Sequence, residues 1–183
     1  MENGVLINKL GLTDTQTLNV IELRIASLEV DRILKEPLPS SFDLAYHRHL
    51  HFQIFHQVYP WAGELRKVDI GKGETLFLPH TQIEAEATRL FSDLASDRFL
   101  KECSHEDFCQ KAGEYLVRLN HIHPFREGNG RSQRLLISRL AQHAGIQMDW
   151  SAVSNESMKR ACIEGVMGNI RQMVRLILLN SKP

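Results

Sequence analysis

The sequence contains few cysteines and no long hydrophobic run, and both absences limit what the protein can be. Only 3 of its 183 residues are cysteine, and Cys103, Cys109 and Cys162 include no Cys-x-x-Cys pair and leave an odd one over. We therefore expect free thiols in a reducing cytoplasm. No apolar stretch reaches the length of a membrane span, and the first residues are too polar for a signal peptide. Neither a membrane segment nor secretion by the general route is expected.

The sequence also lacks an excess of charge of either sign. Lys and Arg together number 22, as do Asp and Glu. Because affinity for a phosphate backbone depends on clustered cations, direct nucleic-acid binding is not expected as the main role. A chain of this length buries a hydrophobic core without disulfides to staple it, so we expect one domain over residues 1–183.

Helical periodicity runs through most of the chain and predicts an all-α protein. The first predicted helix follows a capping box, Thr13-x-x-Gln16, and ends near Lys35 within an N-terminal segment over residues 1–40. Its apolar stripe is predicted from four positions: Leu18, Ile21, Ile25 and Leu28. Further helices are predicted over 42–58 after a serine cap at Ser40 or Ser41, over 81–97 after a cap at Thr81-x-x-Glu84, from Ser104, from about Gly130, and over 155–179 as one or two helices.

One segment, residues 66–78, departs from the helical period. Apolar residues flank Gly71-Lys72-Gly73 there, which predicts a short hairpin with a glycine turn. Because an isolated two-stranded hairpin is only marginally stable, it should lie against the helices or be ordered by a partner. A surface hairpin without a partner is the alternative.

The most informative stretch, residues 123–134, reads His-Pro-Phe-Arg-Glu-Gly-Asn-Gly-Arg-Ser-Gln-Arg. Its Gly128-Asn129-Gly130 turn presents backbone amides that can surround anionic oxygens. The helix predicted to follow would aim its unpaired N-terminal amides at the same anion. This combination predicts phosphate chemistry within a helix-loop-helix over residues 105–144.

Four side chains of this stretch suit such chemistry. Arg131 and Arg134, three apart on one helix face, can grip phosphates through their guanidinium forks. Glu127 is a hard oxygen ligand for Mg²⁺, which is usually held by one or two carboxylates and the phosphates of the substrate. His123 can act as a general base. Phe125 is interpreted as a core anchor that pins the loop.

Each of these residues also has a structural interpretation. A Gly-Asn-Gly is most often a simple turn, two arginines three apart a solvated helix face, and a histidine beside proline a structural residue. His121-x-His123 is also compatible with a fragment of a zinc site, although no cysteine lies nearby and no His-Glu-x-x-His occurs. His47 and His51 are interpreted as structural. Only the joint occurrence of all the elements favours catalysis.

The twelve residues resemble the Fic family signature His-Pro-Phe-x-(Asp/Glu)-Gly-Asn-Gly-Arg-x-x-Arg, with every fixed position filled. The segment from Tyr59 to Arg66, which contains Trp-Ala-Gly, resembles the segment that precedes the hairpin, or flap, of that family. The opening residues 5–11, followed by a long helix, resemble small bacterial Fic toxins. The resemblance implies the Fic-domain helical bundle, with a short β-hairpin flap over the active site.

The resemblance also implies a protein adenylyltransferase that transfers AMP from ATP to a Tyr, Ser or Thr hydroxyl of a target protein. His123 would deprotonate that hydroxyl, and Glu127 would hold Mg²⁺ on the phosphates. The anion hole and the phosphate grip would be formed by Gly128, Asn129, Gly130, Arg131 and Arg134. The flap, which comprises Ile70, Gly71, Lys72, Gly73, Glu74, Thr75 and Leu76, would dock the target by strand addition.

Many Fic proteins carry an inhibitory helix with a Ser/Thr-x-x-x-Glu-Gly/Asn motif, whose glutamate pairs with the second motif arginine. The sequence contains no match, because at Glu164-Gly165 Arg160 stands where Ser or Thr is expected. The chain thus resembles the class inhibited by a small separate antitoxin, and we expect a partner that presents a glutamate to Arg134. Stand-alone Fic toxins often modify gyrase and topoisomerase IV, and these are the favoured targets.

Two other functions stay open. The same fold is compatible with another phosphate-containing donor or with removal of AMP, although Glu127 disfavours the kinase-like relatives that typically carry lysine there. The chain is also compatible with a nucleotide-binding regulator that does not turn over. The intact His123 argues against that alternative, because a protein that only binds has little need of a base.

Overall fold

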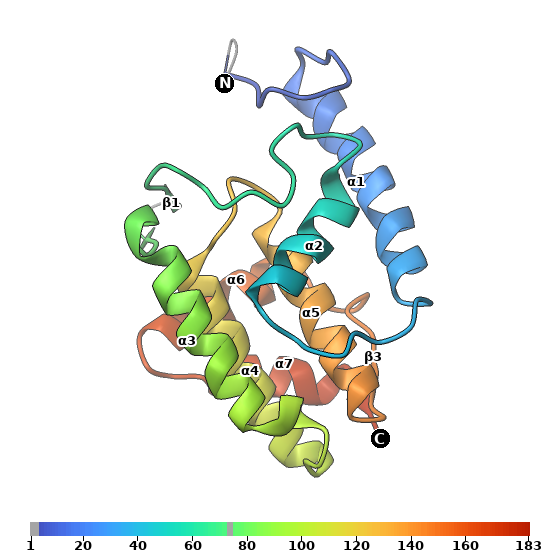
Figure 1. Cartoon of the computed structure of the whole chain (residues 1–183), viewed down its shortest axis with the longest axis vertical. Coiled ribbons are helices and arrows are strands. Elements are labelled where there is room, and N and C mark those ends of the chain that lie inside the picture. Colours follow the sequence, from blue (N-terminus) through green and yellow to red (C-terminus); the bar gives the residue numbers. More distant parts are fainter. Residues whose placement is uncertain (1–3, 73–74) are drawn as a thin grey trace.

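The computed structural model describes residues 4–72 and 75–183, and helices dominate this part of the chain (Figure 1). The all-α prediction is confirmed. The helices are α1 (Thr15–Ile33), α2 (Leu44–Phe55), α3 (Ile83–Ser96), α4 (His105–Ile122), α5 (Asn129–His143), α6 (Asn155–Val166) and α7 (Arg171–Leu179). Short 3-10 turns at His80–Gln82 and Arg98–Leu100 precede and follow α3.

The first two helices begin at aspartates. The Asp14 side chain accepts a hydrogen bond from the Thr17 amide at 2.7 Å, so the capping box predicted at Thr13 is wrong. Asp43 caps α2 in the same way, and the serine cap predicted at Ser40 or Ser41 is also wrong. In both cases a carboxylate closer to the first helical turn provides the acceptor.

The later helices follow the sequence more closely at some ends than at others. The Ser104 side chain accepts a hydrogen bond from the Asp107 amide at 3.1 Å and caps α4 as predicted. The cap predicted at Thr81 is wrong, because this residue lies inside a 3-10 turn and α3 begins at Ile83 without a side-chain cap. The last helical region divides into α6 and α7 beside Gly168, whose φ of +91° belongs to the left-handed region that favours glycine.

Two pairs of very short strands accompany the helices. β1 (Gly71–Lys72) pairs antiparallel with β2 (Thr75–Leu76), which confirms a hairpin within residues 66–78 but with shorter strands than its apolar pattern indicates. Residues 73 and 74 at its tip lie outside the described residues. A second pair, β3 (Gln147–Met148) with β4 (Ser181–Lys182), was not expected, since two-residue strands carry no periodicity.

α4 is the central helix and packs against α3, α5, α6 and α7 (Figure 1). Two glycines allow the C-terminal helices to come close. A Cβ atom at Gly165 would lie 2.4 Å from the Val117 side chain, and one at Gly113 would lie 2.9 Å from Val174. Because α4 and α5 flank residues 123–128, this tight packing supports the loop between them.

α1 buries a different face from the predicted one. Its buried residues are Leu18, Glu22, Ala26 and Ile33, whereas Leu28 of the predicted stripe is 70% exposed. The predicted stripe was therefore only partly right. The buried face follows Leu18, Glu22 and Ala26, which are four residues apart, and then Ile33 two turns later. A carboxylate consequently lies on the buried face.

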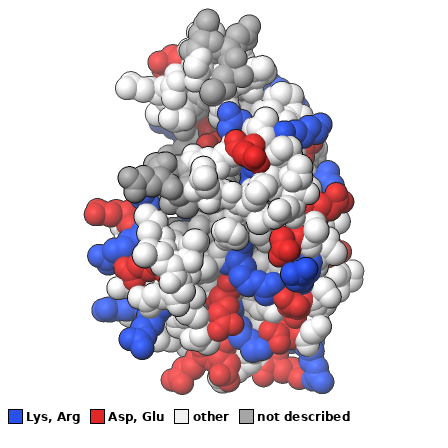
Figure 2. Space-filling view, turned by 90° about the vertical axis from the view of Figure 1, so that its left-hand side faces the viewer, with Lys and Arg blue, Asp and Glu red and all other residues white. Residues whose placement is uncertain are grey.

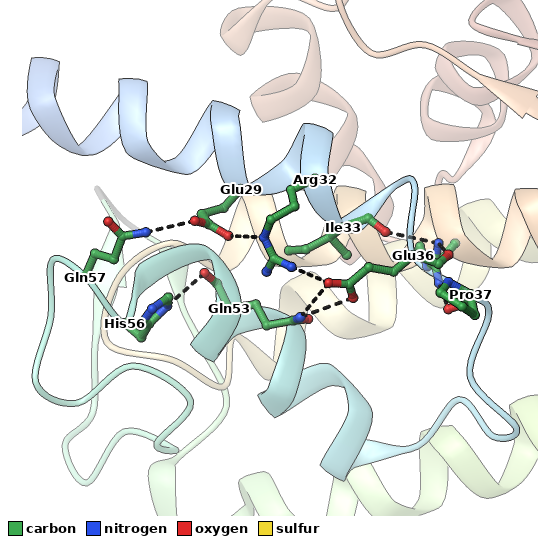
Figure 3. Close-up of polar contacts among 9 residues, drawn as sticks. Glu29, Arg32, Ile33, Glu36, Pro37, Gln53, His56 and Gln57 are labelled. Atoms are coloured by element: carbon green, nitrogen blue, oxygen red, sulfur yellow. Dashed lines mark hydrogen bonds and ion pairs between the residues drawn. The ribbon is translucent and has the colours of Figure 1, made fainter.

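A ladder of polar side chains joins the second half of α1 to α2 and the turn after it (Figure 3). Its members are Glu29, Arg32, Glu36, Gln53 and Gln57. Glu29 accepts hydrogen bonds from Gln57 and from Arg32, each at 2.8 Å. Glu36, just beyond the helix, pairs with Arg32 and accepts a hydrogen bond from Gln53 at 3.2 Å. These contacts fix how α1 lies against α2.

The surface carries charges of both signs. On the face drawn in Figure 2, basic and acidic side chains are interspersed and no region of one sign dominates. Over residues 4–72 and 75–183, every helix is too short or too polar to cross a membrane.

Candidate active site

The loop between α4 and α5 is held together by its own asparagine. α4 ends at His123, whose backbone is left-handed (φ 46°). The Phe125 amide donates to Oδ1 of Asn129 at 2.8 Å, and Asn129 Nδ2 donates back to the Phe125 carbonyl at 2.7 Å. Phe125 is fully buried. The Asn129 side chain therefore closes the loop, and only its backbone amide remains for the anion contact predicted for this residue.

Gly128 makes the turn into α5 possible. Its φ is +79°, and a Cβ atom there would lie 2.4 Å from the Phe55 ring. Its amide donates to Oε1 of Glu127 at 2.9 Å. Only a glycine combines this backbone conformation with this close approach, so Gly128 shapes the loop from behind.

The N-terminus of α5 offers unpaired amides. The amides of Arg131 and Ser132 donate to the Gly128 carbonyl at 3.2 and 3.1 Å. Within the described part of the chain, the amides of Asn129 and Gly130 have no acceptor. These two amides lie at the positive end of a 15-residue helix, a position that suits an anion.

Two buried histidines of α2 support the loop. The Gly63 amide donates to Nδ1 of His51 at 2.9 Å, so Nε2 carries the proton and donates to the Glu127 carbonyl at 2.9 Å. Nε2 of His47 lies 3.2 Å from the Ser132 hydroxyl. Burial lowers the pKa of His51 to about 4 and that of His47 to about 3. Both are therefore neutral structural residues at neutral pH, as the sequence interpretation has them.

The His123 ring is oriented on two sides. Its Nδ1 lies 3.2 Å from the Asn120 carbonyl, which can only accept, so Nδ1 carries a proton. The Phe77 ring stacks on the imidazole, with centroids 3.7 Å apart and an angle of 16° between the planes. An imidazole held in a fixed orientation at a cavity wall suits a general base.

Arg66 ties the hairpin to this loop. Its guanidinium donates to the carbonyls of Ile122 (3.2 Å) and His123 (2.8 Å). It also donates to the carbonyls of Val68 (2.8 Å) and Leu78, one in each stem of the hairpin. Arg66 is only 4% exposed, and burial lowers its pKa. The hairpin and His123 therefore share one buried anchor.

A cavity of about 640 Å³ opens beside the loop. The predicted site residues that line it are His123, Glu127, Asn129, Gly130, Arg131 and Arg134. Gly128 lies behind this wall, against Phe55. Of the predicted flap, Ile70, Gly71 and Leu76 do not line the cavity, whereas Phe77 from the hairpin stem does.

The two motif arginines have different surroundings. Arg131 forms an ion pair through Nη2 with the buried Glu22, and its guanidinium lies 4.7 Å over the centre of the Phe55 ring. Arg134 has no ion pair with any residue that the structure describes. Burial and the neighbouring charge of Arg131 lower the pKa of Arg134. An anion in the cavity would offset the repulsion between the two guanidinium groups and would therefore bind favourably beside Arg134.

The metal ligands available fit Mg²⁺ better than zinc. Glu127 is an exposed carboxylate in the cavity wall. No group of three or more His, Cys, Asp or Glu residues that could enclose a metal occurs among the described residues, so His121 and His123 have no further ligands for a zinc site. A single carboxylate suits Mg²⁺, which takes its other ligands from water and substrate phosphates.

Sequence reasoning missed Glu22, Phe77 and the role of Arg66. An acid at the four-residue spacing of Leu18 and Ala26 was a usable signal for Glu22, because a carboxylate on a buried helix face is rarely unpaired. Arg66 and Phe77 gave no such signal. Their partners are backbone carbonyls and a ring far away in the sequence.

Comparison with known proteins agrees with this geometry. The sequence pattern of the Fic/DOC family matches residues 41–141. The chain is 39% identical to the protein adenylyltransferase VbhT of Bartonella schoenbuchensis over 98% of this chain, although it spans only 37% of VbhT. It is 34% identical to the probable protein adenylyltransferase Fic of Salmonella typhimurium, covering 91% of this chain and 82% of that protein. The BepC structure from Bartonella tribocorum, with bound AMPPNP, superposes with a TM-score of 0.92 at 31% identity and covers 98% and 93% of the two chains. The chain belongs to the Fic/DOC family.

Proposed function

We propose that this chain is a protein adenylyltransferase, which transfers AMP from ATP to a hydroxyl side chain of another protein. The observation that carries the proposal is the single cavity shared by His123, two arginines and the free amides at the start of α5. A base and a phosphate grip that line the same cavity suit phosphoryl chemistry that depends on positioning and electrostatics. Relatives named protein adenylyltransferase support the same conclusion.

The reaction follows from the orientation of His123. The target hydroxyl gives its proton to Nε2, and its oxygen attacks the α-phosphorus of ATP. The bond from that phosphorus to the β-phosphate oxygen breaks, and pyrophosphate leaves with the electron pair. Arg131, Arg134 and the amides of Asn129 and Gly130 stabilise the charge that accumulates on the phosphate oxygens. No covalent enzyme intermediate is needed.

Glu127 is the residue that would hold Mg²⁺ in this reaction. When bound, the ion would neutralise part of the charge on the nucleotide phosphates. Glu127 is well supported for this role, because its carbonyl is held by His51 and its Oε1 accepts the Gly128 amide.

The hairpin is the surface on which the target would dock. Leu76 in β2 is 79% exposed, so its side chain is available for an apolar contact with a target segment. An extended target segment would add to the hairpin edge and bring its hydroxyl to His123. The target class expected for a small Fic toxin is a type II topoisomerase.

A separate inhibitor is part of the proposal. Glu164 lies away from Arg134 and accepts a hydrogen bond from Asn169 at 3.2 Å. The exposed side chains of Leu23, Ile163 and Val166 border the cavity, and they would accept a partner helix whose carboxylate reaches Arg134. The purified chain should therefore be active alone. Strong autoinhibition that is released by Glu164→Gln would contradict this.

The transferase is tested with ATP labelled on the α-phosphate. The purified chain, Mg²⁺ and a bacterial lysate are expected to give labelled protein bands, whereas His123→Ala gives none. His121→Ala is the matched control, because that histidine is exposed and two residues away. If the wild type binds ATP but labels nothing, the proposal fails and a nucleotide-binding regulator is supported instead.

A further inference from the structure

Glu22 is a buried carboxylate next to Arg131, which lines the cavity. It is 3% exposed and comes from the buried face of α1. The Tyr59 hydroxyl donates to its Oε2 at 2.8 Å. Its Oε1 pairs with Nη2 of Arg131 and accepts no well-aligned hydrogen bond from a described residue. The charge of this oxygen is therefore balanced by the guanidinium alone.

The carboxylate has little freedom to leave. Burial and the Glu22 charge raise the pKa of Tyr59, which keeps the phenol protonated as a donor, and its ring stacks on Trp61 with centroids 4.4 Å apart. Removing one partner of a buried ion pair leaves the other charge uncompensated at a high cost.

The consequence is an asymmetry between the motif arginines. Arg131 is held at one edge by Glu22 and across its plane by Phe55, while its side chain still lines the cavity and is 23% exposed. An arginine fork has five N–H donors, so the contact to Glu22 leaves others for phosphate. Arg134 has no comparable restraint among the described residues.

We propose that Glu22 is a positioning residue that holds Arg131 in the orientation needed to stabilise the departing phosphates. This rests on the proposed transferase function. Glu22 is not among the residues that line the cavity, so it would act through Arg131. Because the pair is fixed before the nucleotide binds, its main effect is on the transition state rather than on ground-state affinity.

The test compares Glu22→Gln with Glu29→Gln. Both changes remove one carboxylate charge from α1, but Glu29 lies in the polar ladder on the α1–α2 contact. Glu22→Gln is expected to lower kcat by about 10- to 100-fold and to change the affinity for ATP, measured by calorimetry, by less than about threefold. Glu29→Gln should lower stability slightly and leave kcat unchanged. Equal losses of kcat in the two variants would overturn the proposal.

A double-mutant cycle with Arg131→Gln tests the route of the effect. If Glu22 acts through Arg131, Glu22→Gln has no further effect on kcat in the Arg131→Gln background. Because Arg131→Gln leaves a buried unpaired carboxylate, the double variant should also be more stable than this single variant. Additive effects on kcat would overturn the proposal. So would Glu22→Gln binding ATP tenfold more tightly with kcat retained, because Glu22 would then be a competing anion.

Arginine side-chain ¹⁵N relaxation separates this inference from the transferase proposal. Glu22→Gln should increase the fast motion of the Arg131 Nε–H group, whereas Glu29→Gln should not. If no variant labels any protein but Arg131 becomes mobile in Glu22→Gln alone, the transferase proposal fails and the positioning of Arg131 by Glu22 stands. If Arg131 is equally mobile in the wild type, the positioning inference fails.

Discussion

At the scale of single residues, the two glycines of the motif serve different purposes. Gly128 has a φ of +79°, and a Cβ atom there would lie 2.4 Å from Phe55. Gly130 has no positive φ, and a Cβ atom there would meet only Nη1 of Arg134, at 3.4 Å. The conformation of the loop therefore requires glycine at position 128, and the open space beside the cavity requires glycine at position 130.

We predict that alanine at these two positions fails in different ways. Gly128→Ala should lower the free energy of unfolding by about 2–4 kcal/mol, because left-handed strain and overpacking add. Gly130→Ala should fold at least as stably, since alanine favours a helix by roughly 0.5–1 kcal/mol, but its methyl group crowds the phosphate site. Denaturant unfolding and ADP calorimetry on both variants measure the two effects. Equal losses of stability would contradict the assignment.

At the scale of elements, the hairpin depends on one buried side chain. Arg66 donates to carbonyls of both hairpin stems and of Ile122 and His123 at the start of the motif loop. The hairpin strands are only two residues long, so they cannot hold this arrangement by themselves. The position of the flap relative to His123 thus follows from Arg66.

We predict that Arg66→Met lowers the free energy of unfolding by about 3–5 kcal/mol, because several buried carbonyls lose a charged donor. Arg66→Lys should fold better but lose kcat, since an ammonium group cannot reach both stems and the loop at once. Hydrogen exchange of the Leu78 amide, which donates to the His121 carbonyl at 3.1 Å, reports the loosened stem.

Lys67→Met is the matched control, because the Lys67 side chain is 86% exposed. It should leave both kcat and the exchange rate of the Leu78 amide unchanged. If Arg66→Lys behaves like Lys67→Met in both measurements, the hairpin is held by other contacts.

The sequence predicts the elements of this fold better than their ends. Helical periodicity located the long helices, because a buried face repeats over several turns. Caps at Thr13 and Thr81 were wrong, since nearby competitors such as Asp14 differ by one hydrogen bond that no pattern encodes. The β3–β4 pair depends on a contact between residues 147–148 and 181–182. Strands of two residues are too short to show a periodic pattern, so the sequence did not predict this pair.

The same distinction applies to the site. A contiguous motif placed His123, Glu127 and both arginines correctly in one cavity, because local spacing on a loop and one helix turn determines their proximity. The supports come from distant segments. Glu22 reaches the cavity only through the packing of α1, so its part follows from tertiary structure.

At the scale of the whole molecule, neutral histidines connect α2 to the motif loop. His51 accepts the Gly63 amide on Nδ1 and donates from Nε2 to the Glu127 carbonyl, which leaves no place for a second ring proton. His47 is fully buried, and its Nδ1 has no hydrogen-bond partner among the described residues. Burial is the main cause of the low pKa of both rings. The neighbouring His51 lowers the pKa of His47 further, and the charge of Arg131 lowers that of His51.

We predict that the protein loses stability as the pH falls below about 6.5. The folded-state pKa values, about 3 for His47 and about 4 for His51, lie below the ordinary value of 6.5. The unfolded chain therefore binds more protons between these limits, and stability rises with pH. Each histidine should contribute about 1.4 kcal/mol of loss per pH unit. Denaturant unfolding at pH 7 and pH 5.5 measures it, in a range above most carboxylate pKa values.

The variants separate these two rings from the remaining histidines. His51→Gln lowers stability at pH 7, because it loses a buried contact, but it should reduce the difference between pH 7 and pH 5.5 by roughly half. His49→Gln removes an exposed ring from the same helix and should leave the difference unchanged. A pH dependence that persists in the combined His47→Gln and His51→Gln variant would show that other groups control it. If the pH dependence disappears in His51→Gln but persists in His47→Gln, His51 alone controls it.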